Sequence, residues 1–303
     1  MKRPLRDAFD THDKGRCDRS SGVAVRAGAV TAEADGSDDV HNLWLARMAA
    51  VCSAVGALPT SHDLYTNAED DRWIRARRRQ QRDLIDRIWE ELGTAVPRDG
   101  NAIISGGMAG AGKTYVLKGP AGINLDEYLT INPDDIKEQM ARQGMIPLVD
   151  GFSPMEASLR VHEEASELTK RLARRAYAYR TNVIWDITMN RRDTVHQRLD
   201  DLFDASYGVI EAVFVDTTPD EAIKRVVSRY RRGQEPFDRG EPDAIGGRAV
   251  LLAYMEESRT ESGYNSTNRA VFEAVRHDFQ SSVVYDNSGT EPEQLSCHGP
   301  RWE

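Results

Sequence analysis

The sequence is poor in cysteine and has no long apolar run. Its three cysteines, Cys17, Cys52 and Cys297, share no metal-ligand spacing, so we expect neither a zinc site nor a disulfide framework, and a reducing cytoplasm is the simplest location. No apolar run of about 18 residues occurs, and the charged N-terminus lacks the apolar core of a secretory signal, so we expect no membrane association. A formal net charge of −9 argues against nucleic acid as the main partner.

Composition and apolar periodicity divide the 303 residues into three parts. Residues 1–40 are rich in Asp, Arg, Gly, Ser and Thr without apolar periodicity, which predicts a disordered tail. Residues 41–96 carry two amphipathic helical patterns and are expected to form a helical extension. The arginines of the run 75–79 fall on the wet side of the second pattern, as on an ordinary solvated helix face. Residues 97–303 remain for one large α/β domain.

Short apolar runs alternate with helical patterns beyond residue 97. The runs predicted as strands are 102–104, 130–131, 182–185, 209–215 and 282–285. This alternation is typical of a mostly parallel sheet built from βαβ units. A capping hydroxyl, a proline and a glutamate mark two helix starts, at Ser153 and Thr218, which predict helices over 154–179 and 219–233.

A phosphate-binding loop (P-loop) follows the first predicted strand. The residues from Gly107 to Thr114 fit the pattern G-x-x-x-x-G-K-[ST], which arises by chance in roughly one in a hundred chains of this length. The glycines let backbone N–H groups point at phosphate oxygens, Lys113 reaches the β- and γ-phosphates, and Thr114 offers a hydroxyl to Mg²⁺. The predicted nucleotide-binding residues are Gly107, Met108, Ala109, Gly110, Ala111, Gly112, Lys113 and Thr114.

The remainder of the chain favours a small-substrate kinase. No guanine-reading N/T-K-x-D segment follows a late strand, so ATP is favoured over GTP. Asp134 follows the second strand, where a carboxylate can accept the proton of an attacking hydroxyl; alternatively the loop merely caps the next helix. Asp186 ends the third strand as a candidate Mg²⁺ ligand, and Thr188 is a candidate substrate contact. These features predict a P-loop kinase-like fold, a three-layer α/β/α domain with a mostly parallel sheet.

A segment rich in glycine, proline and charge follows the fourth strand and its helix. We expect residues 231–248 to form a mobile lid, with Arg229 and Arg248 near its edges. There the two arginines can neutralise charge on a transferring phosphoryl group; alternatively they complement the dipole of the helix. On the preceding long helix, Glu164 lies at the edge of the apolar stripe, where its side chain can face a cleft.

Taken together, these motifs resemble those of the zeta toxin family, the kinase components of bacterial toxin–antitoxin pairs. The segments that carry the resemblance are GGMAGAGKT (106–114), INPDDIK (131–137), VHEEAS (161–166), NVIWDITM (182–189), VFVDTTPDEAIKRVVSRYRRG (213–233) and GGRAV (246–250). The likeness extends over residues 100–288 and is closer to actinobacterial zeta-like proteins, which also carry an N-terminal helical extension.

The resemblance implies that ATP and Mg²⁺ are used to phosphorylate a 3′-hydroxyl of UDP-N-acetylglucosamine, and that a small helical antitoxin is a partner. The implied roles are general base for Asp134, substrate contact for Thr188 and Glu164, and phosphate ligand for Lys113, Arg229 and Arg248. The first acidic position of the family's D-x-D loop is Asn132 here. Three alternatives stay open: another small acceptor such as NAD, a nucleotide-dependent regulatory module without transfer activity, and N-terminal helices that cover the site as an antitoxin would.

Overall fold

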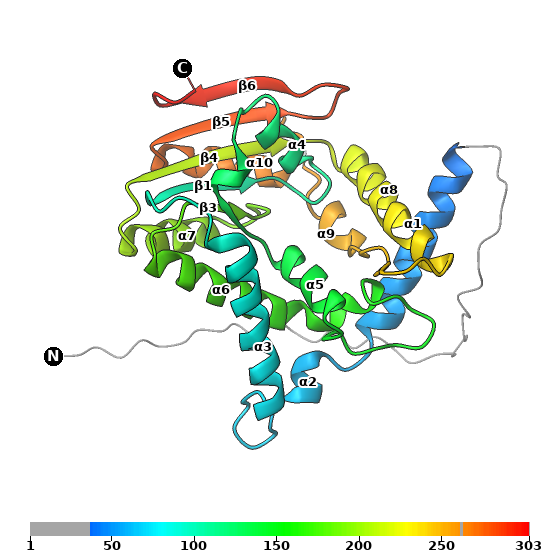
Figure 1. The fold of residues 1–303 in the computed structure, drawn as a ribbon. Helices are drawn as coiled ribbons and strands as arrows, with labels where there is room; N and C mark the ends of the chain where they lie inside the picture. The colour runs from blue at the N-terminus through cyan, green and yellow to red at the C-terminus, as the bar shows by residue number, and fades with distance from the viewer. Residues whose placement is uncertain (1–36, 261–262, 303) are drawn as a thin grey trace.

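The computed structural model describes residues 37–260 and 263–302 (Figure 1). The described chain begins with helix α1, Ser37–Gly56, four residues before the predicted start of the helical extension. The predicted disordered tail therefore lies outside the described residues, apart from residues 37–40, which are helical.

A six-stranded sheet forms the centre of the molecule (Figure 1). Its strands are β1 (Asn101–Gly106), β2 (Leu129–Ile131), β3 (Val183–Asp186), β4 (Val209–Asp216), β5 (Ser281–Asp286) and β6 (Glu293–His298). The strand order is β2-β3-β1-β4-β5-β6; the first five are parallel, and β6 pairs antiparallel with β5. The prediction of an α/β fold with a mostly parallel sheet is confirmed, whereas the edge strand β6 was not predicted.

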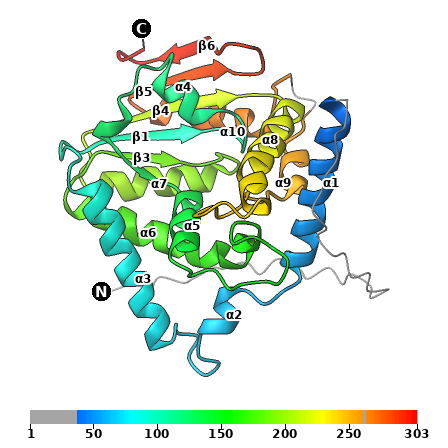
Figure 2. The same cartoon turned by 45° about the vertical axis from the view of Figure 1, so that its right-hand side comes forward.

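Helices cover both faces of the sheet, as a buried parallel sheet requires (Figure 2). Successive strand residues point to opposite faces, so Ile103 and Ile104 belong to two separate clusters of buried apolar side chains. With Ile104 lie α3 (Arg75–Ile88), α5 (Pro133–Arg142), α6 (His162–Ala178), α7 (Arg192–Asp204) and α10 (Thr267–Val275). With Ile103 lie α1, α4 (Lys113–Lys118), α8 (Pro219–Asp238) and α9 (Leu252–Glu256). The predicted three-layer arrangement is therefore present.

Both predicted capping sequences make their hydrogen bonds. The backbone N–H of Ser153 donates to Glu156 Oε2 over 2.8 Å, and the N–H of Glu156 donates to Ser153 Oγ over 3.2 Å. Thr218 Oγ1 accepts from the N–H of Glu221 over 3.3 Å. The helix predicted over 154–179 nevertheless starts with 3₁₀ turns, Glu156–Val161, and becomes α-helical only at α6. Two further 3₁₀ turns are Leu125–Glu127 and Arg276–Asp278.

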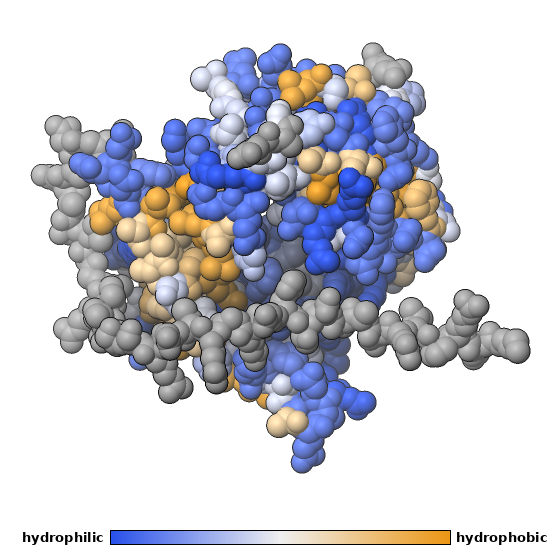
Figure 3. All heavy atoms as spheres, turned by 180° about the vertical axis from the view of Figure 1, so that it is seen from behind, coloured by the Kyte–Doolittle hydropathy of each residue, from blue (hydrophilic) through white to orange (hydrophobic). Residues whose placement is uncertain are grey.

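Helix α1 of the N-terminal extension packs beside α8. Its residues Trp44, Met48 and Val55 are buried, and the Trp44 ring meets the ring of Tyr230 edge-on, with centroids 5.7 Å apart. By length and composition alone, Asp38–Tyr65 is long and apolar enough to cross a membrane, and apolar side chains also gather on this side of the surface (Figure 3). The packing against α8 gives the apolar inner face of α1 a role in the core.

The rest of the extension packs against the layer of helices that contains α6. A short helix that was not predicted, α2 (Ser61–Tyr65), precedes α3. The second predicted helix of the extension is α3, which begins at Arg75 and is followed by a π-helical turn, Trp89–Gly93. Three apolar residues of α3, Leu84, Ile85 and Ile88, are buried in the same cluster as α6. Both ends of the extension are thus integral to the packing of the domain.

Candidate active site

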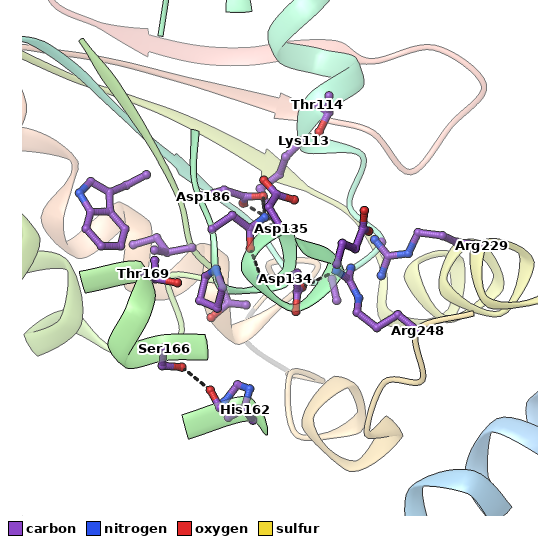
Figure 4. Close-up of a pocket in the computed structure, with 18 of the residues that line it drawn as sticks. Lys113, Thr114, Asp134, Asp135, His162, Ser166, Thr169, Asp186, Arg229 and Arg248 are labelled. Carbon is purple, nitrogen blue, oxygen red and sulfur yellow. Dashed lines mark hydrogen bonds and ion pairs between the residues drawn. The ribbon is translucent and has the colours of Figure 1, made fainter. Parts of the chain in front are cut away.

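A cavity of about 830 Å³ opens at the carboxyl ends of the parallel strands (Figure 4). In open α/β sheets ligands bind at this edge, because strand ends and the following helix starts converge there. The predicted site residues that line the cavity are Ala109, Gly110, Gly112, Lys113, Thr114, Asp134, Asp186, Thr188, Arg229 and Arg248. Segments up to 139 residues apart in the sequence therefore meet around one space, and the predicted site residues that do not line it are Gly107, Met108, Ala111 and Glu164.

The P-loop connects β1 to α4 through left-handed backbone that only glycine adopts easily. Gly107 has φ 135° and Gly110 has φ 83°. A Cβ at Gly107 would lie 2.3 Å from the carbonyl oxygen of Val215, and one at Gly110 would lie 2.4 Å from that of Ala222. Both approaches are to backbone, so a larger residue would displace the loop. Asn287, the residue after β5, supports the loop by donating from its Nδ2 to the carbonyl oxygen of Ala111 over 2.7 Å.

Lys113 lies folded over the P-loop. Its Nζ donates to the carbonyl oxygen of Gly107 over 2.7 Å and lies 3.3 Å from Asp186 Oδ1. The other carboxylate oxygen of Asp186 accepts from Asn132 Nδ2 over 2.9 Å. The departure from the family's D-x-D pattern therefore has a structural use, since the Asn132 amide holds Asp186 while Lys113 neutralises it.

Asp134 stands at the start of α5 between two cations. Its Oδ2 lies 3.1 Å from Arg248 Nη1, and its Oδ1 lies 3.3 Å from Lys137 Nζ. Burial alone raises the pKa of this carboxyl, but Arg248, Lys137 and Arg229 together outweigh it and hold the pKa below its ordinary value. The capping function falls to Asn132, whose Oδ1 accepts from the N–H of Asp134 over 2.8 Å. The Asp134 side chain therefore does not act as the cap, and it lines the cavity.

A second carboxyl, Asp135, was not singled out by the sequence. It lines the same cavity, and burial together with the neighbouring carboxylates Glu138, Asp186 and Asp134 raises its pKa to about 7, against a smaller opposing effect of Arg248. Adjacent residues of one helix turn therefore carry carboxyls with opposite pKa shifts. The signal was present as the pair of aspartates after the second strand, but the direction of each shift depends on neighbours from other elements.

The predicted lid is partly helical and is anchored. α8 continues beyond residue 233, through Pro236, so residues 231–238 belong to the helix. Gln234 Oε1 accepts hydrogen bonds from Ser153 Oγ and from the backbone N–H of Gly247, each over 2.9 Å. The expectation that the helix ends near residue 233 was wrong, because Gln234 faces a buried polar partner instead of solvent.

Arg229 and Arg248 face the cavity from α8 and from the returning loop (Figure 4). Burial, followed by the charge of Arg248, lowers the pKa of Arg229 to about 10 despite Asp134 nearby. Arg248 Nε is buried without a hydrogen-bond partner in the described part of the chain. Two close guanidinium groups with spare donors fit an anion with several oxygens, such as a phosphoryl group.

Glu164 lies away from this cavity, which corrects the expectation that it faces a cleft. Its side chain is fully buried and pairs with Arg77 of α3 through two contacts of 2.7 Å, Nε to Oε1 and Nη2 to Oε2. Gln81 Nε2 donates to Oε1 as well, over 2.7 Å. The sequence placed Arg77 on a solvated face, and only the fold shows that α3 turns this arginine towards α6.

The face of α6 that does line the cavity carries His162, Ser166, Thr169 and Lys170. Ser166 Oγ donates to the carbonyl oxygen of His162 over 2.9 Å, as the close-up shows (Figure 4). The sequence signal for this face was that each of these residues lies three or four positions from another one, a spacing that recurs on one side of a helix. The place of His162 in the cavity wall could not be read from the sequence.

Of the cavity residues with oxygen donors, Thr114 of the P-loop and Asp186, next to Lys113, are the ones predicted to hold Mg²⁺. Within the described residues, no group of three or more His, Cys, Asp or Glu side chains could hold a metal ion. A kinase site needs no such group, because Mg²⁺ usually takes one or two protein oxygens together with phosphate and water. The donor set therefore fits Mg²⁺ that arrives with a nucleotide.

Comparison with known proteins identifies the family of this chain. A match to the family described as Zeta toxin covers residues 91–291. No curated protein sequence matches the chain. Two similar solved structures are AvrRxo1-ORF1:AvrRxo1-ORF2 with sulphate ions (TM-score 0.54, 15% identity, 79% of this chain and 77% of that chain) and the same pair with ATP (0.52, 15%, 79% and 76%).

A further similar structure comes from the PezAT chromosomal toxin–antitoxin system of Streptococcus pneumoniae, with a TM-score of 0.49, 13% identity and coverage of 73% of this chain and 83% of that chain. At 15% identity, the likeness to the two AvrRxo1-ORF1:AvrRxo1-ORF2 structures concerns the fold. The family match spans two thirds of the sequence and includes the P-loop, Asp134, Asp186, Arg229 and Arg248. The chain belongs to the zeta toxin family.

Proposed function

We propose that this protein is an ATP-dependent phosphotransferase that moves the γ-phosphoryl group of ATP to a hydroxyl of a nucleotide-sugar. The observation that carries the proposal is the meeting of Lys113, Asp134, Arg229 and Arg248 around one cavity. A phosphate anchor, a carboxylate and two guanidinium groups are the parts that phosphoryl transfer requires. The family match supports the kinase reaction, and the nucleotide-sugar is the more specific part of the proposal.

The donor end of the reaction is held by the P-loop. Backbone N–H groups between Gly107 and Thr114 bind the β- and γ-phosphates, and Lys113 leaves its loop carbonyls to meet them. Bound Mg²⁺ would draw charge from the β- and γ-phosphate oxygens, with Thr114 and Asp186 holding it. As the γ-phosphoryl group leaves ADP, Arg229 and Arg248 neutralise the charge on its oxygens.

Asp134 binds the acceptor hydroxyl and accepts its proton. Its pKa is held low, so it is ionised throughout the neutral range and accepts a hydrogen bond from the hydroxyl. When Arg248 turns to the phosphoryl group, Oδ2 of Asp134 is released from its 3.1 Å contact and can take the proton. The acceptor oxygen then bonds to phosphorus as the bond to ADP breaks.

We propose UDP-N-acetylglucosamine as the acceptor, with NAD or another small metabolite as the alternative, and a helical antitoxin as a protein partner. Purified protein should be incubated with ATP, Mg²⁺ and each candidate acceptor, and the products followed by mass. Asp134→Asn should abolish transfer while ATP affinity is kept; Asp200→Asn, on the exposed side of α7, is the matched control.

Consumption of ATP by slow hydrolysis alone, without a phosphorylated product, would contradict the transferase. An Asp134→Asn protein that behaves like wild type in cells would instead support a nucleotide-dependent regulatory module, in which the N-terminal helices engage a partner. Product from NAD but not from the nucleotide-sugar would retain the kinase and replace the acceptor.

A further inference from the structure

Helix α1 of the N-terminal extension carries one cation against the body of the domain. The helix lies against α8 and against the 3₁₀ turns that precede α6 (Figure 2). Arg47 is the only arginine or lysine of α1, and its side chain is 16% exposed. This residue does not line the cavity. Its contacts therefore concern how the neighbouring elements are held.

Arg47 joins two carboxylates that come from different elements. Its Nη1 and Nη2 donate to Oδ2 and Oδ1 of Asp238, at the end of α8, over 2.5 and 3.0 Å. Nη2 also lies 3.5 Å from Oε1 of Glu156, whose side chain is 1% exposed. In the part of the chain that the structure describes, no other cation pairs with either carboxylate. Loss of Arg47 would therefore leave Glu156 as a buried charge among neutral donors.

A continuous chain of hydrogen bonds runs from Arg47 to the backbone beside Arg248. Oδ1 of Asp238 accepts from Gln234 Nε2 over 2.8 Å. Gln234 Oε1 accepts in turn from the backbone N–H of Gly247 over 2.9 Å, and Gly247 immediately precedes Arg248. Arg47 holds the Asp238 carboxylate through two parallel N–H groups, which fix its orientation. The orientation of that carboxylate fixes the Gln234 amide, and the amide fixes the peptide next to Arg248.

A second branch of the same network reaches Arg229. Oε1 of Glu156 accepts from the hydroxyl of Tyr230 over 2.5 Å, and Tyr230 follows Arg229 on α8. Trp44, which precedes Arg47 by about one turn of α1, meets the fully buried Tyr230 ring edge-on. Both arginines of the cavity are thus one residue away from a group that α1 helps to hold.

We propose that Arg47 is a positioning residue, which holds Arg229 and Arg248 at the γ-phosphate of ATP from outside the cavity. This inference rests on the proposed function, in which the two arginines neutralise the transferring phosphoryl group. Arg47 lies outside residues 91–291, so α1 adds a support that the matched segment of the family does not itself contain. The N-terminal extension then promotes the reaction, whereas a helix that covered the site as an antitoxin would suppress it.

The test compares two nucleotides that differ by the γ-phosphate. ADP with Mg²⁺ occupies the P-loop alone, whereas a non-hydrolysable ATP analogue also meets the two arginines. Calorimetry should show that the wild-type protein binds the analogue at least about tenfold more tightly than ADP, since a hydrogen bond between charged groups contributes that much or more. Arg47→Met should lose most of this preference, while its affinity for ADP changes by less than about twofold. Its transfer rate with saturating substrates should fall by about 10–100-fold, because the arginines are displaced.

Val55→Ala is the matched control. It trims another buried side chain of α1, about two turns beyond Arg47, and leaves the chain of hydrogen bonds complete. Its preference for the analogue should stay within about twofold of the wild-type value. If Arg47→Met does not fold, Asp238→Ala decides the outcome, because it interrupts the same chain at a side chain that is 28% exposed. The same loss of preference is expected of it.

An unchanged preference in Arg47→Met would overturn the positioning role. An equal loss in Val55→Ala, or a fall in ADP affinity as large as that for the analogue, would overturn it as well, and so would equal binding of both nucleotides by the wild-type protein. A protein that shows the preference, loses it in Arg47→Met and yet transfers no phosphoryl group would refute the proposed function and leave the positioning role intact. Normal transfer by Arg47→Met would do the reverse.

Discussion

Removing the guanidinium of Arg77 should destabilise the whole domain, although this residue lies in the N-terminal extension. Arg77 pairs bidentately with Glu164, donates to the carbonyl oxygen of Met145 over 2.8 Å and lies over the ring of Tyr65 at 4.6 Å. Arg77 is 3% exposed and the Glu164 side chain is fully buried. In Arg77→Met the carboxylate keeps only Gln81 as a neutral donor, so a buried charge loses its counter-ion.

The expected size follows from that uncompensated charge. Breaking a buried ion pair by removing one partner costs about 3–5 kcal/mol. At roughly 2–4 °C per kcal/mol for domains of about this size, the melting temperature should fall by roughly 6–20 °C. Adding Glu164→Gln to Arg77→Met removes the buried charge, so most of the loss should be recovered, because Gln81 can still donate to the new amide.

Urea unfolding followed by circular dichroism measures these differences. Arg78→Met, at the neighbouring exposed position of α3, is the matched control and should change stability by less than about 0.5 kcal/mol. The double variant should also keep its transferase activity, since Glu164 lies outside the cavity. A destabilisation below about 1 kcal/mol in Arg77→Met would refute the buried-pair reasoning, and a folded double variant that has lost acceptor affinity would restore Glu164 as a substrate contact.

Three further changes have definite expected outcomes. Lys113→Ala should lower the transfer rate by about 100–1000-fold with the fold retained, while the same change at Lys118, beyond the cavity, should not, as steady-state kinetics can show. Burial and neighbouring carboxylates raise the pKa of Asp135, so its contribution to stability declines as pH rises from about 4 to 7. Asp135→Asn should therefore have a higher melting temperature than wild type at pH 8 and the same melting temperature at low pH. An unchanged melting temperature at pH 8 would contradict this. A Cβ at Gly247 would lie 2.1 Å from the carbonyl oxygen of Tyr230, so Gly247→Ala should displace the adjacent arginine and lower the transfer rate by up to about 100-fold, against no change for Gly208→Ala, whose Cβ meets nothing within 4 Å.

The parts of the fold predicted correctly are those encoded by short-range patterns. The P-loop, the capping sequences at Ser153 and Thr218 and the strand ending at Asp186 each depend on a few neighbouring residues. The conformational preference of glycine, helix capping and the apolar pattern of strands each depend on residues that are close in sequence. The elements and their order could therefore be predicted from the sequence alone. The edge strand β6 was missed because it is half exposed and carries no continuous apolar run.

The misassigned residues are those whose environment is set by distant segments. Glu164 and Arg77 are 87 residues apart, and each alone resembles a surface residue of an amphipathic helix. The predicted lid was read from its glycine, proline and charge, yet Gln234 meets Ser153 across the fold and keeps the helix going. The opposite pKa shifts of Asp134 and its neighbour likewise depend on which cations the tertiary structure brings close.

The central claim is that one cavity transfers a phosphoryl group from ATP to an acceptor hydroxyl. Its most direct test is to incubate the protein with ATP, Mg²⁺ and UDP-N-acetylglucosamine beside a metabolite extract, and to compare masses with those from Asp134→Asn. We expect one acceptor to gain the mass of a single phosphoryl group with the wild-type protein and not with the variant. ADP and free phosphate as the sole products would contradict it.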